Sequence, residues 1–266
     1  MSAAERKWLT LPDTPCLPDG GKEGAFDISG ARIWYRDYGS GPPVIFLHGG
    51  LGNSDYWGRQ VAALLETWRV IVMDSRGQGR SSRGDDAMSY ALMAGDVLGL
   101  IDHLKLPKAA IVGWSDGAII GLLLAMSHAD RITGVFAFGA NSGPNGTYDL
   151  TDNVMFNKYI ERTRNEYAQL LPGRGSFDAF LGEMGAMWDT QPDMTVAGLK
   201  KIAVPVWIAD GDHEEVIRRE DTLFLADHIP DAGLLIQPDV SHFSVLQDPD
   251  QFTTDVARFL RSKGIV

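Results

Sequence analysis

The stretch that decides the fold is residues 110–117, which read AIVGWSDG. An apolar run typical of a buried strand leads into it, and the strongly apolar run at 116–128 is typical of a helix packed under a sheet. Between them stands the pattern Gly-x-Ser-x-Gly, with Ser115 at its centre and Gly113 and Gly117 two residues away on either side. A sharp turn from strand to helix strains its central residue and leaves no room for side chains at those two glycines. The pattern therefore predicts a strand–turn–helix elbow with Ser115 at its tip.

This elbow has a chemical consequence. It lifts the Ser115 hydroxyl clear of the sheet and sets it at a helix N-terminus, where partial positive charge favours negative charge developing on a substrate oxygen. A serine hydroxyl is nevertheless a poor nucleophile unless a neighbouring base takes its proton. A nucleophilic Ser115 therefore requires a base and an acid from elsewhere in the chain.

Outward from the elbow, short apolar runs alternate with helical patterns. The runs lack strict period 2, as strands buried on both faces of a parallel sheet do. Two runs at 25–28 and 32–36, separated by Ser-Gly-Ala, predict a hairpin ahead of them. The predicted core strands are 44–47, 70–73, 109–112, 135–138, 204–209 and 234–236, and the predicted helices are 90–104, 116–128 and 249–263. This alternation predicts an α/β fold with a doubly wound, mostly parallel sheet.

The alternation stops between about residues 141 and 200. This stretch has helical periodicity and many aromatic residues and methionines, but no obvious strand, and it is too long for a plain loop. We expect residues 1–140 and 201–266 to form the α/β core and residues 141–200 to form a helical cap insertion over one edge of the sheet. We expect the insertion to line an apolar pocket with some of Phe156, Tyr159, Met184, Met187 and Trp188.

Length, charge and cysteine content exclude several classes of protein. The 266 residues suit one large core, and 24 basic against 35 acidic residues give a net charge of −11, which disfavours nucleic acid and anionic membranes as partners. The single cysteine, Cys16, excludes an internal disulfide and a cysteine-based zinc site. No run approaches the roughly 20 apolar residues of a membrane span, and the first 18 residues lack the apolar run of a signal peptide. These features predict a soluble cytoplasmic protein with a small-molecule substrate, and they leave homo-oligomerisation open.

The base is predicted to be His242. This histidine follows the last predicted strand and precedes the terminal helix, so it lies at the carboxyl edge of the sheet, as the elbow does. His103, His128 and His228 fall in or at the ends of helical patterns, which favours solvated or capping roles.

The acid that orients the base is predicted to come from the loop after the strand at 204–209. This loop also ends at the carboxyl edge of the sheet, and it is crowded with carboxylates around Gly211. The candidates are Asp210, Asp212, Glu214 and Glu215. The residues alone leave the choice open.

With these motifs in this order, the chain from about residue 25 to the C-terminus resembles the α/β-hydrolase family. In that family the acid loop often reads Gly-x-x-Asp, which from Gly211 implies Glu214 as the catalytic acid, with Asp212 as the main alternative. The sequence departs here from the commoner Asp, so the loop has to accommodate an extra methylene. The chain order Ser115, Glu214, His242 is the order that this fold uses.

The resemblance also implies an oxyanion hole. The run FLHGGLG at 46–52 follows the first core strand, and such a segment supplies one main-chain N–H, here that of Gly50, while the residue after the nucleophile, Asp116, supplies the other. Losing one such donor costs roughly 3 kcal/mol in comparable enzymes. His48 is expected to organise this loop rather than to act as a catalyst. The run DSRGQGRS at 74–81 resembles a family segment with a role in loop architecture.

The function implied by the resemblance is hydrolysis of an ester, lactone or similar small carbonyl compound through an acyl-enzyme, without a metal or organic cofactor. The elbow GWSDG is similar to that of valacyclovir hydrolase-like amino-acid esterases. Hydrolysis of a C–C bond in a diketone-like metabolite uses the same triad and stays an alternative, as does a low-turnover ligand sensor on the same fold. Serine at the elbow argues against the haloalkane dehalogenases and epoxide hydrolases of this fold, which use Asp there.

Overall fold

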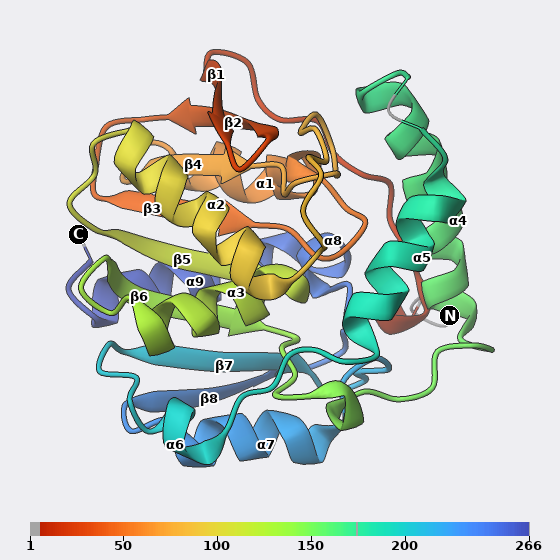
Figure 1. Ribbon diagram of the computed structural model, residues 1–266. Helices are drawn as coiled ribbons and strands as arrows, with labels where there is room; N and C mark the ends of the chain where they lie inside the picture. The colour runs from red at the N-terminus through yellow and green to blue at the C-terminus, as the bar shows by residue number, and fades with distance from the viewer. Residues whose placement is uncertain (1–5, 174, 266) are drawn as a thin grey trace, which may run out of the picture.

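The molecule is built around an eight-stranded β-sheet in the computed structural model, which describes residues 6–173 and 175–265 (Figure 1). The strands are β1 (Lys22–Ile28), β2 (Ala31–Tyr38), β3 (Pro43–Leu47), β4 (Arg69–Met73), β5 (Ala109–Trp114), β6 (Ile132–Phe138), β7 (Val206–Gly211) and β8 (Ala232–Gln237). They lie in the order β1-β2-β4-β3-β5-β6-β7-β8. The β1–β2 and β2–β4 pairs are antiparallel, whereas all other neighbours are parallel. The predicted hairpin and mostly parallel sheet are therefore confirmed.

Helices cover both faces of this sheet. Figure 1 shows α2 and α3 in front of it and α1 and α9 behind it. The α-helices are α1 (Gly58–Leu64), α2 (Tyr90–His103), α3 (Asp116–Ser127), α4 (Val154–Leu170), α5 (Phe177–Trp188), α6 (Val196–Leu199), α7 (Arg219–His228), α8 (Ser244–Gln247) and α9 (Pro249–Ser262). Three 3₁₀ turns accompany them, η1 (Lys7–Leu9), η2 (Ser54–Trp57) and η3 (Pro144–Gly146). The doubly wound arrangement is confirmed.

The centre of the core lies where β5 meets α3. All six residues of β5 are buried, and so are nine of the twelve residues of α3, because this helix is covered by the sheet on one side and by α2 on the other. An apolar helix with little amphipathic character is what such a position requires. The two elements joined by the elbow are thus almost wholly buried.

The carboxyl ends of the parallel strands meet at one edge of the sheet, and the loops that follow them carry the predicted site residues. Ser115 follows β5, Glu214 lies in the loop after β7, and His242 lies in the loop after β8. Helices α4 and α5 lie beside this edge, on the right in Figure 1. Apart from residue 174, which is not described, the stretch 141–200 contributes helices and turns but no strand of the sheet.

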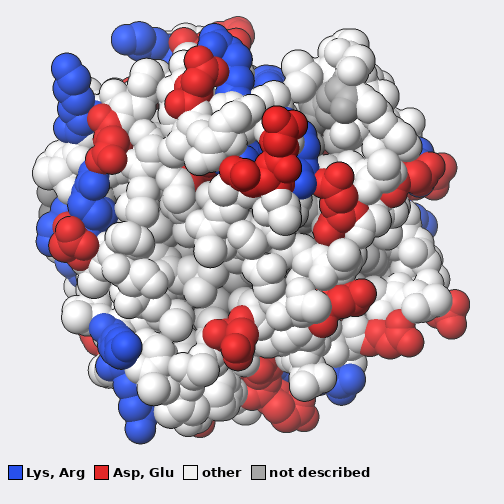
Figure 2. Space-filling view, in the orientation of Figure 1, with Lys and Arg blue, Asp and Glu red and all other residues white. Residues whose placement is uncertain are grey.

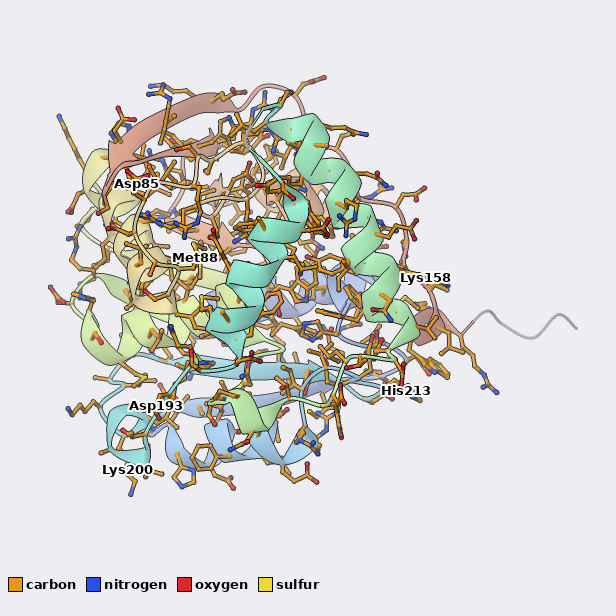
Figure 3. The ribbon with its side chains drawn as sticks, turned by 45° about the vertical axis from the view of Figure 1, so that its right-hand side comes forward. Asp85, Met88, Lys158, Asp193, Lys200 and His213 are labelled. Carbon is orange, nitrogen blue, oxygen red and sulfur yellow. The ribbon has the colours of Figure 1, made fainter. Side chains whose placement is uncertain are left out.

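The segment before β1 contacts both helix α4 and the loop after β7. Arg162, on α4, donates a hydrogen bond to the carbonyl of Pro12 at 2.6 Å. The Trp8 ring stacks on the His213 ring with centroids 3.8 Å apart. Figure 3 shows His213 and Lys158, the latter on α4, on the side of the molecule along which this segment runs. This segment is therefore docked against both α4 and the loop after β7.

On the face shown in Figure 2 a small central area is uncharged, and charged side chains lie around it as well as along the rim. Acidic side chains prevail on the side of α4 and α5, in keeping with the net charge of −11. Among the helices of the described residues, none has the length and apolar character needed to cross a bilayer.

A buried ion pair fixes the loop after β4. The Arg76 and Asp96 side chains are 0% and 1% exposed, and two hydrogen bonds of 2.7 and 2.5 Å join them. Replacing Asp96 with alanine leaves a buried guanidinium without its partner, so we expect Asp96→Ala to lower the free energy of unfolding by about 3–5 kcal/mol. Urea unfolding followed by circular dichroism measures this loss.

The matched control is Asp102→Ala, on the same helix. The Asp102 side chain is 68% exposed and pairs with Arg131 at 2.6 Å, and exposed pairs contribute only about 0–1 kcal/mol. Equal losses of stability in Asp96→Ala and Asp102→Ala would contradict the importance given to the buried pair.

Candidate active site

Ser115 stands at a strained turn between β5 and α3. Its backbone angles are φ 56° and ψ −121°, in a region that residues other than glycine rarely adopt. A methyl group at Gly117 would collide with the Leu47 carbonyl, and one at Gly113 with the backbone of Gly117. The Ser115 N–H donates to the Phe138 carbonyl at 2.8 Å, which ties the turn to β6. The structure shows the predicted strand–turn–helix elbow, with both glycines where space is lacking.

A pocket of about 650 Å³, its open mouth included, lies over this elbow. Its lining comprises Gly49, Gly50, Tyr90, Trp114, Ser115, Asp116, Asn141, Thr147, Leu150, Phe156, Tyr159, Trp188, Gln191, Val216, Ile217, His242 and Phe243. Both the nucleophile and the base predicted from the sequence therefore face one cavity.

Three of the five residues of the stretch 141–200 that were named as pocket candidates line this cavity. Phe156, Tyr159 and Trp188 do so, whereas Met184 and Met187 are buried in the hydrophobic core away from the lining. This agrees with the expectation that some of the five line a pocket; helical periodicity could not say which, because it shows that a side chain is buried but not which element covers it.

His242 is buried against Glu214. Its Nδ1 lies 2.9 Å from Glu214 Oε1, and the two side chains are 3% and 2% exposed. The distance suits a hydrogen bond, although the angle at Nδ1 falls short of one; such contacts are often loose before substrate binds. Glu214 Oε1 also accepts the main-chain N–H groups of Val216 at 2.8 Å and Ile217 at 3.0 Å. These bonds hold the longer glutamate side chain toward the ring.

The other three acidic residues of this loop occupy different positions. The Asp212 side chain is 38% exposed and lies 3.9 Å from His213 Nε2. Glu215 accepts the main-chain N–H of His242 at 3.1 Å, so it holds the backbone of that loop. Asp210 is fully buried at the end of β7. Within the described chain, only Glu214 lies within ion-pair distance of the His242 ring.

Burial governs the ionisation of this cluster. It raises the pKa of the Glu214 carboxyl to about 7, with the charge of Glu215 raising it further and hydrogen bonds from Asp210 and the loop backbone opposing the rise. Burial lowers the pKa of the His242 imidazole, while nearby carboxylates oppose that change. The imidazole is therefore neutral at neutral pH and able to accept a proton.

No hydrogen bond joins the Ser115 hydroxyl to the His242 ring among the interactions of the described residues, although both side chains line the pocket. The His242 loop is anchored beside the elbow, because Trp114 Nε1 donates to the His242 carbonyl at 2.7 Å. The serine and the histidine thus line one cavity.

The two residues predicted for the oxyanion hole also line the pocket. Within the part of the chain that the structure describes, the main-chain N–H groups of Gly50 and Asp116 donate to no protein acceptor. The Gly50 carbonyl accepts a hydrogen bond from the Tyr159 hydroxyl of α4 at 2.8 Å, which holds this peptide in place. Two uncommitted N–H donors therefore belong to the pocket that contains Ser115.

His48 joins the loops after β3 and β4. Its Nδ1 lies 2.8 Å from the Gly49 carbonyl, and its Nε2 accepts the Ser75 N–H at 3.0 Å. These partners assign the proton to Nδ1. His48 is buried and does not line the pocket, so it occupies the organising position expected for it.

The Asp116 side chain is a pocket feature that the sequence analysis missed, since only its N–H was predicted to matter. Its carboxylate is buried and accepts the Tyr90 hydroxyl at 2.7 Å and Trp188 Nε1 at 3.2 Å. Burial raises its pKa to about 6, and both hydrogen bonds oppose the rise. No short motif could have revealed this cluster, because its partners come from α2 and α5, far from the elbow in sequence.

Comparisons with known proteins agree with this fold and site. A model of the alpha/beta hydrolase fold matches residues 42–178, just over half of the chain. A protein of Caulobacter sp. (strain K31) with the provisional name carbamate hydrolase RutD is 27% identical over 261 residues, covering 86% of this chain and 96% of its own.

Two solved structures match over their full lengths. Est816, described as an N-acyl homoserine lactone degrading enzyme, superposes with a TM-score of 0.76 and 26% identity over 89% of this chain and 100% of its own. The enol-lactonase from Burkholderia xenovorans LB400 superposes with a TM-score of 0.73 and is 25% identical, over 90% of this chain and 100% of its own. Together with the elbow and the sheet order, these matches show that the chain belongs to the α/β-hydrolase family of enzymes.

Proposed function

We propose that the protein hydrolyses an ester or lactone bond of a small carbonyl substrate through an acyl-enzyme on Ser115. The observation that carries this proposal is the buried contact between Glu214 and His242. The same histidine lines the pocket that contains Ser115. The similarity to two lactone-cleaving enzymes over their full lengths supports this class of substrate.

In the proposed mechanism, Ser115 Oγ attacks the substrate carbonyl carbon while His242 Nε2 accepts the hydroxyl proton. The negative charge on the tetrahedral intermediate is stabilised by the N–H groups of Gly50 and Asp116, which have no other acceptor in the described protein. His242 then protonates the leaving alkoxide, and water releases the acyl group by the same steps. Glu214 orients His242 and stabilises the imidazolium that forms in between.

The proposed substrate is a small molecule with an apolar acyl or alcohol group. Apolar walls are supplied by Phe156, Tyr159 and Trp188 from the segment 141–200, which we propose as a cap on the core formed by the rest of the chain. Apolar pockets with few polar groups favour such substrates. A panel of esters in which only highly charged members are cleaved would count against this class.

The test begins with a fluorophosphonate probe, which labels nucleophilic serines of this kind. We expect a mass increase on the peptide that contains Ser115 and turnover of p-nitrophenyl esters, lactones or amino-acid esters. A protein that binds panel members without turnover and takes up no label would be a ligand sensor. Cleavage of a vinylogous diketone but of no ester would instead identify a C–C bond hydrolase.

The pH dependence of kcat/KM follows from Glu214. Its raised pKa of about 7 means that the carboxylate gains a proton as pH falls through that value and then no longer stabilises the imidazolium. We expect kcat/KM to be constant at higher pH and to fall on the acid side of about pH 7. Activity that holds constant down to the ordinary pKa of a glutamate, about 4.3, would contradict this. Asp212→Asn should keep the wild-type profile, because that side chain is exposed and away from the ring.

A further inference from the structure

We propose that Tyr159 is a positioning residue for the oxyanion hole, whose hydroxyl fixes the backbone at Gly50 so that the Gly50 N–H stays directed into the pocket. This inference rests on the proposed function, because it explains how one donor of the proposed oxyanion hole is kept in its orientation. It gives helix α4 a part in stabilising the tetrahedral intermediate, in addition to lining the pocket.

The backbone at Gly50 has no side chain to hold it. A Cβ at this position would lie 2.5 Å from Asp116 Oδ2 and 2.6 Å from a ring carbon of Trp188, so only glycine fits. Glycine is the residue with the greatest backbone freedom, whereas an oxyanion donor is effective only when its direction is fixed in advance. The orientation of the Gly50 N–H therefore has to come from hydrogen bonds to the peptide groups on either side.

Both of these peptide groups are hydrogen-bonded. The Gly49 carbonyl accepts His48 Nδ1 at 2.8 Å and the Gly52 N–H at 3.1 Å. Because C=O and N–H point in opposite directions across a trans peptide, these two bonds direct the Gly50 N–H away from His48. The next carbonyl, that of Gly50, accepts the Tyr159 hydroxyl at 2.8 Å and no other donor of the described residues. Tyr159 alone thus fixes the second peptide.

The Tyr159 ring is itself held in place beside the catalytic residues. The side chain is buried, and its ring centroid lies 5.8 Å from that of Trp114 and 5.2 Å from that of Phe243. Trp114 precedes Ser115, and Phe243 follows His242. A ring packed in this way cannot swing its hydroxyl away, so the bond to the oxyanion loop is preorganised.

The loop leaves room for this hydroxyl only because residue 52 is glycine. A Cβ at Gly52 would lie 2.9 Å from the Tyr159 oxygen. A contact that short would force the hydroxyl to shift, because the packed ring carries it. The last glycine of the run HGGLG is therefore suited to admit a side chain from α4.

The test compares Tyr159→Phe with the wild type. Phenylalanine keeps the ring and its packing but removes the hydroxyl, so the Gly50 carbonyl loses its donor. Losing an oxyanion donor outright costs about 10²- to 10³-fold in kcat. Because Tyr159→Phe loosens the donor without removing it, we expect kcat to fall about 5- to 30-fold and KM to change less than about twofold. Fluorophosphonate labelling should slow by a similar factor, since the phosphoryl oxygen of the probe enters the same hole.

Tyr38→Phe is the matched control. The Tyr38 hydroxyl donates to the Pro18 carbonyl at 3.0 Å and lies outside the pocket. Both variants lose one hydrogen bond from a tyrosine to a main-chain carbonyl, so comparable falls in melting temperature are expected. Only Tyr159→Phe should also lose kcat. Wild-type kcat in Tyr159→Phe, or a loss confined to KM, would overturn the inference.

A second measurement reports the Gly50 amide directly and needs no activity. The sequence contains two Gly-Gly pairs, so glycine labelled with ¹³C at the carbonyl and with ¹⁵N gives carbonyl-correlated amide signals from Gly21 and Gly50 alone. Gly21 packs on the Tyr38 ring, so Tyr38→Phe identifies its signal. We expect a Gly50 order parameter of about 0.85 in the wild type and a clearly lower one in Tyr159→Phe. An equally rigid Gly50 in both proteins would overturn the inference.

The two proposals fail in distinguishable ways. Wild-type protein without fluorophosphonate labelling or turnover would remove the proposed function, while the Gly50 signal would still show whether the Tyr159 hydroxyl orders this amide. Wild-type protein that hydrolyses esters, with unchanged kcat in Tyr159→Phe, would remove this inference alone.

Discussion

Replacing Ser115 with alanine is expected to lower kcat roughly 10⁵- to 10⁶-fold for the ester or lactone that the wild type cleaves best, with KM changed only a few-fold. The loss is large because the mechanism has no other nucleophile, and removal of the serine in comparable triads costs about 10⁶-fold in kcat. Residual activity above the uncatalysed rate would come from substrate binding and the oxyanion donors. Fluorophosphonate labelling should disappear together with turnover.

Stability provides the necessary check on this variant. A backbone angle of φ 56° is about equally unfavourable for alanine and for serine. The melting temperature of Ser115→Ala should therefore stay close to that of wild type. Ser127→Ala, at the exposed end of the same helix α3, is the matched control and should keep full activity. A folded Ser115→Ala protein that retained more than a tenth of wild-type kcat would refute the proposed nucleophile.

The parts of the fold that follow from local physics were predictable from the sequence. Strands such as β5, buried on both faces, must be continuous apolar runs, and the space at Gly113 and Gly117 is limited by backbone atoms that any such elbow places there. The bounds of helix α7 were not predicted, although His228 was expected to lie in or at the end of a helix. Only Thr222 and Leu225 of its ten residues are buried, so its sequence lacks the broad apolar stripe that identifies a helix.

The site was predictable to the level of loops but not of contacts within them. Chain order and sheet topology place Ser115 and His242 at one edge, which needs no knowledge of side-chain conformation. Which carboxylate reaches the ring depends on the path of the loop after β7, and no pattern encodes that path. The contacts of Asp116 with Tyr90 and Trp188 are likewise made between segments whose packing only the structure gives.

The second large effect on kcat is expected from replacing Glu214, in the loop after β7. We expect Glu214→Gln to lower kcat about 10³- to 10⁴-fold, because a neutral amide neither stabilises the imidazolium nor selects the productive tautomer of His242. Asp212→Asn should stay within about twofold of wild type, since loss of a charge on an exposed side chain changes little. Steady-state kinetics on the best substrate of the panel, at a pH above about 8 where Glu214 is ionised, measures both.

A third variant separates the effect of the charge of Glu214 from the effect of its side-chain length. Glu214→Asp keeps the carboxylate but shortens it by one methylene, and the N–H groups of Val216 and Ile217 hold the present carboxylate where the longer chain places it. We therefore expect Glu214→Asp to lie between wild type and Glu214→Gln in kcat, because its charge survives while its distance from Nδ1 grows. Full activity in Glu214→Gln with loss in Asp212→Asn would transfer the role of the acid to Asp212 and require the loop to rearrange when substrate binds.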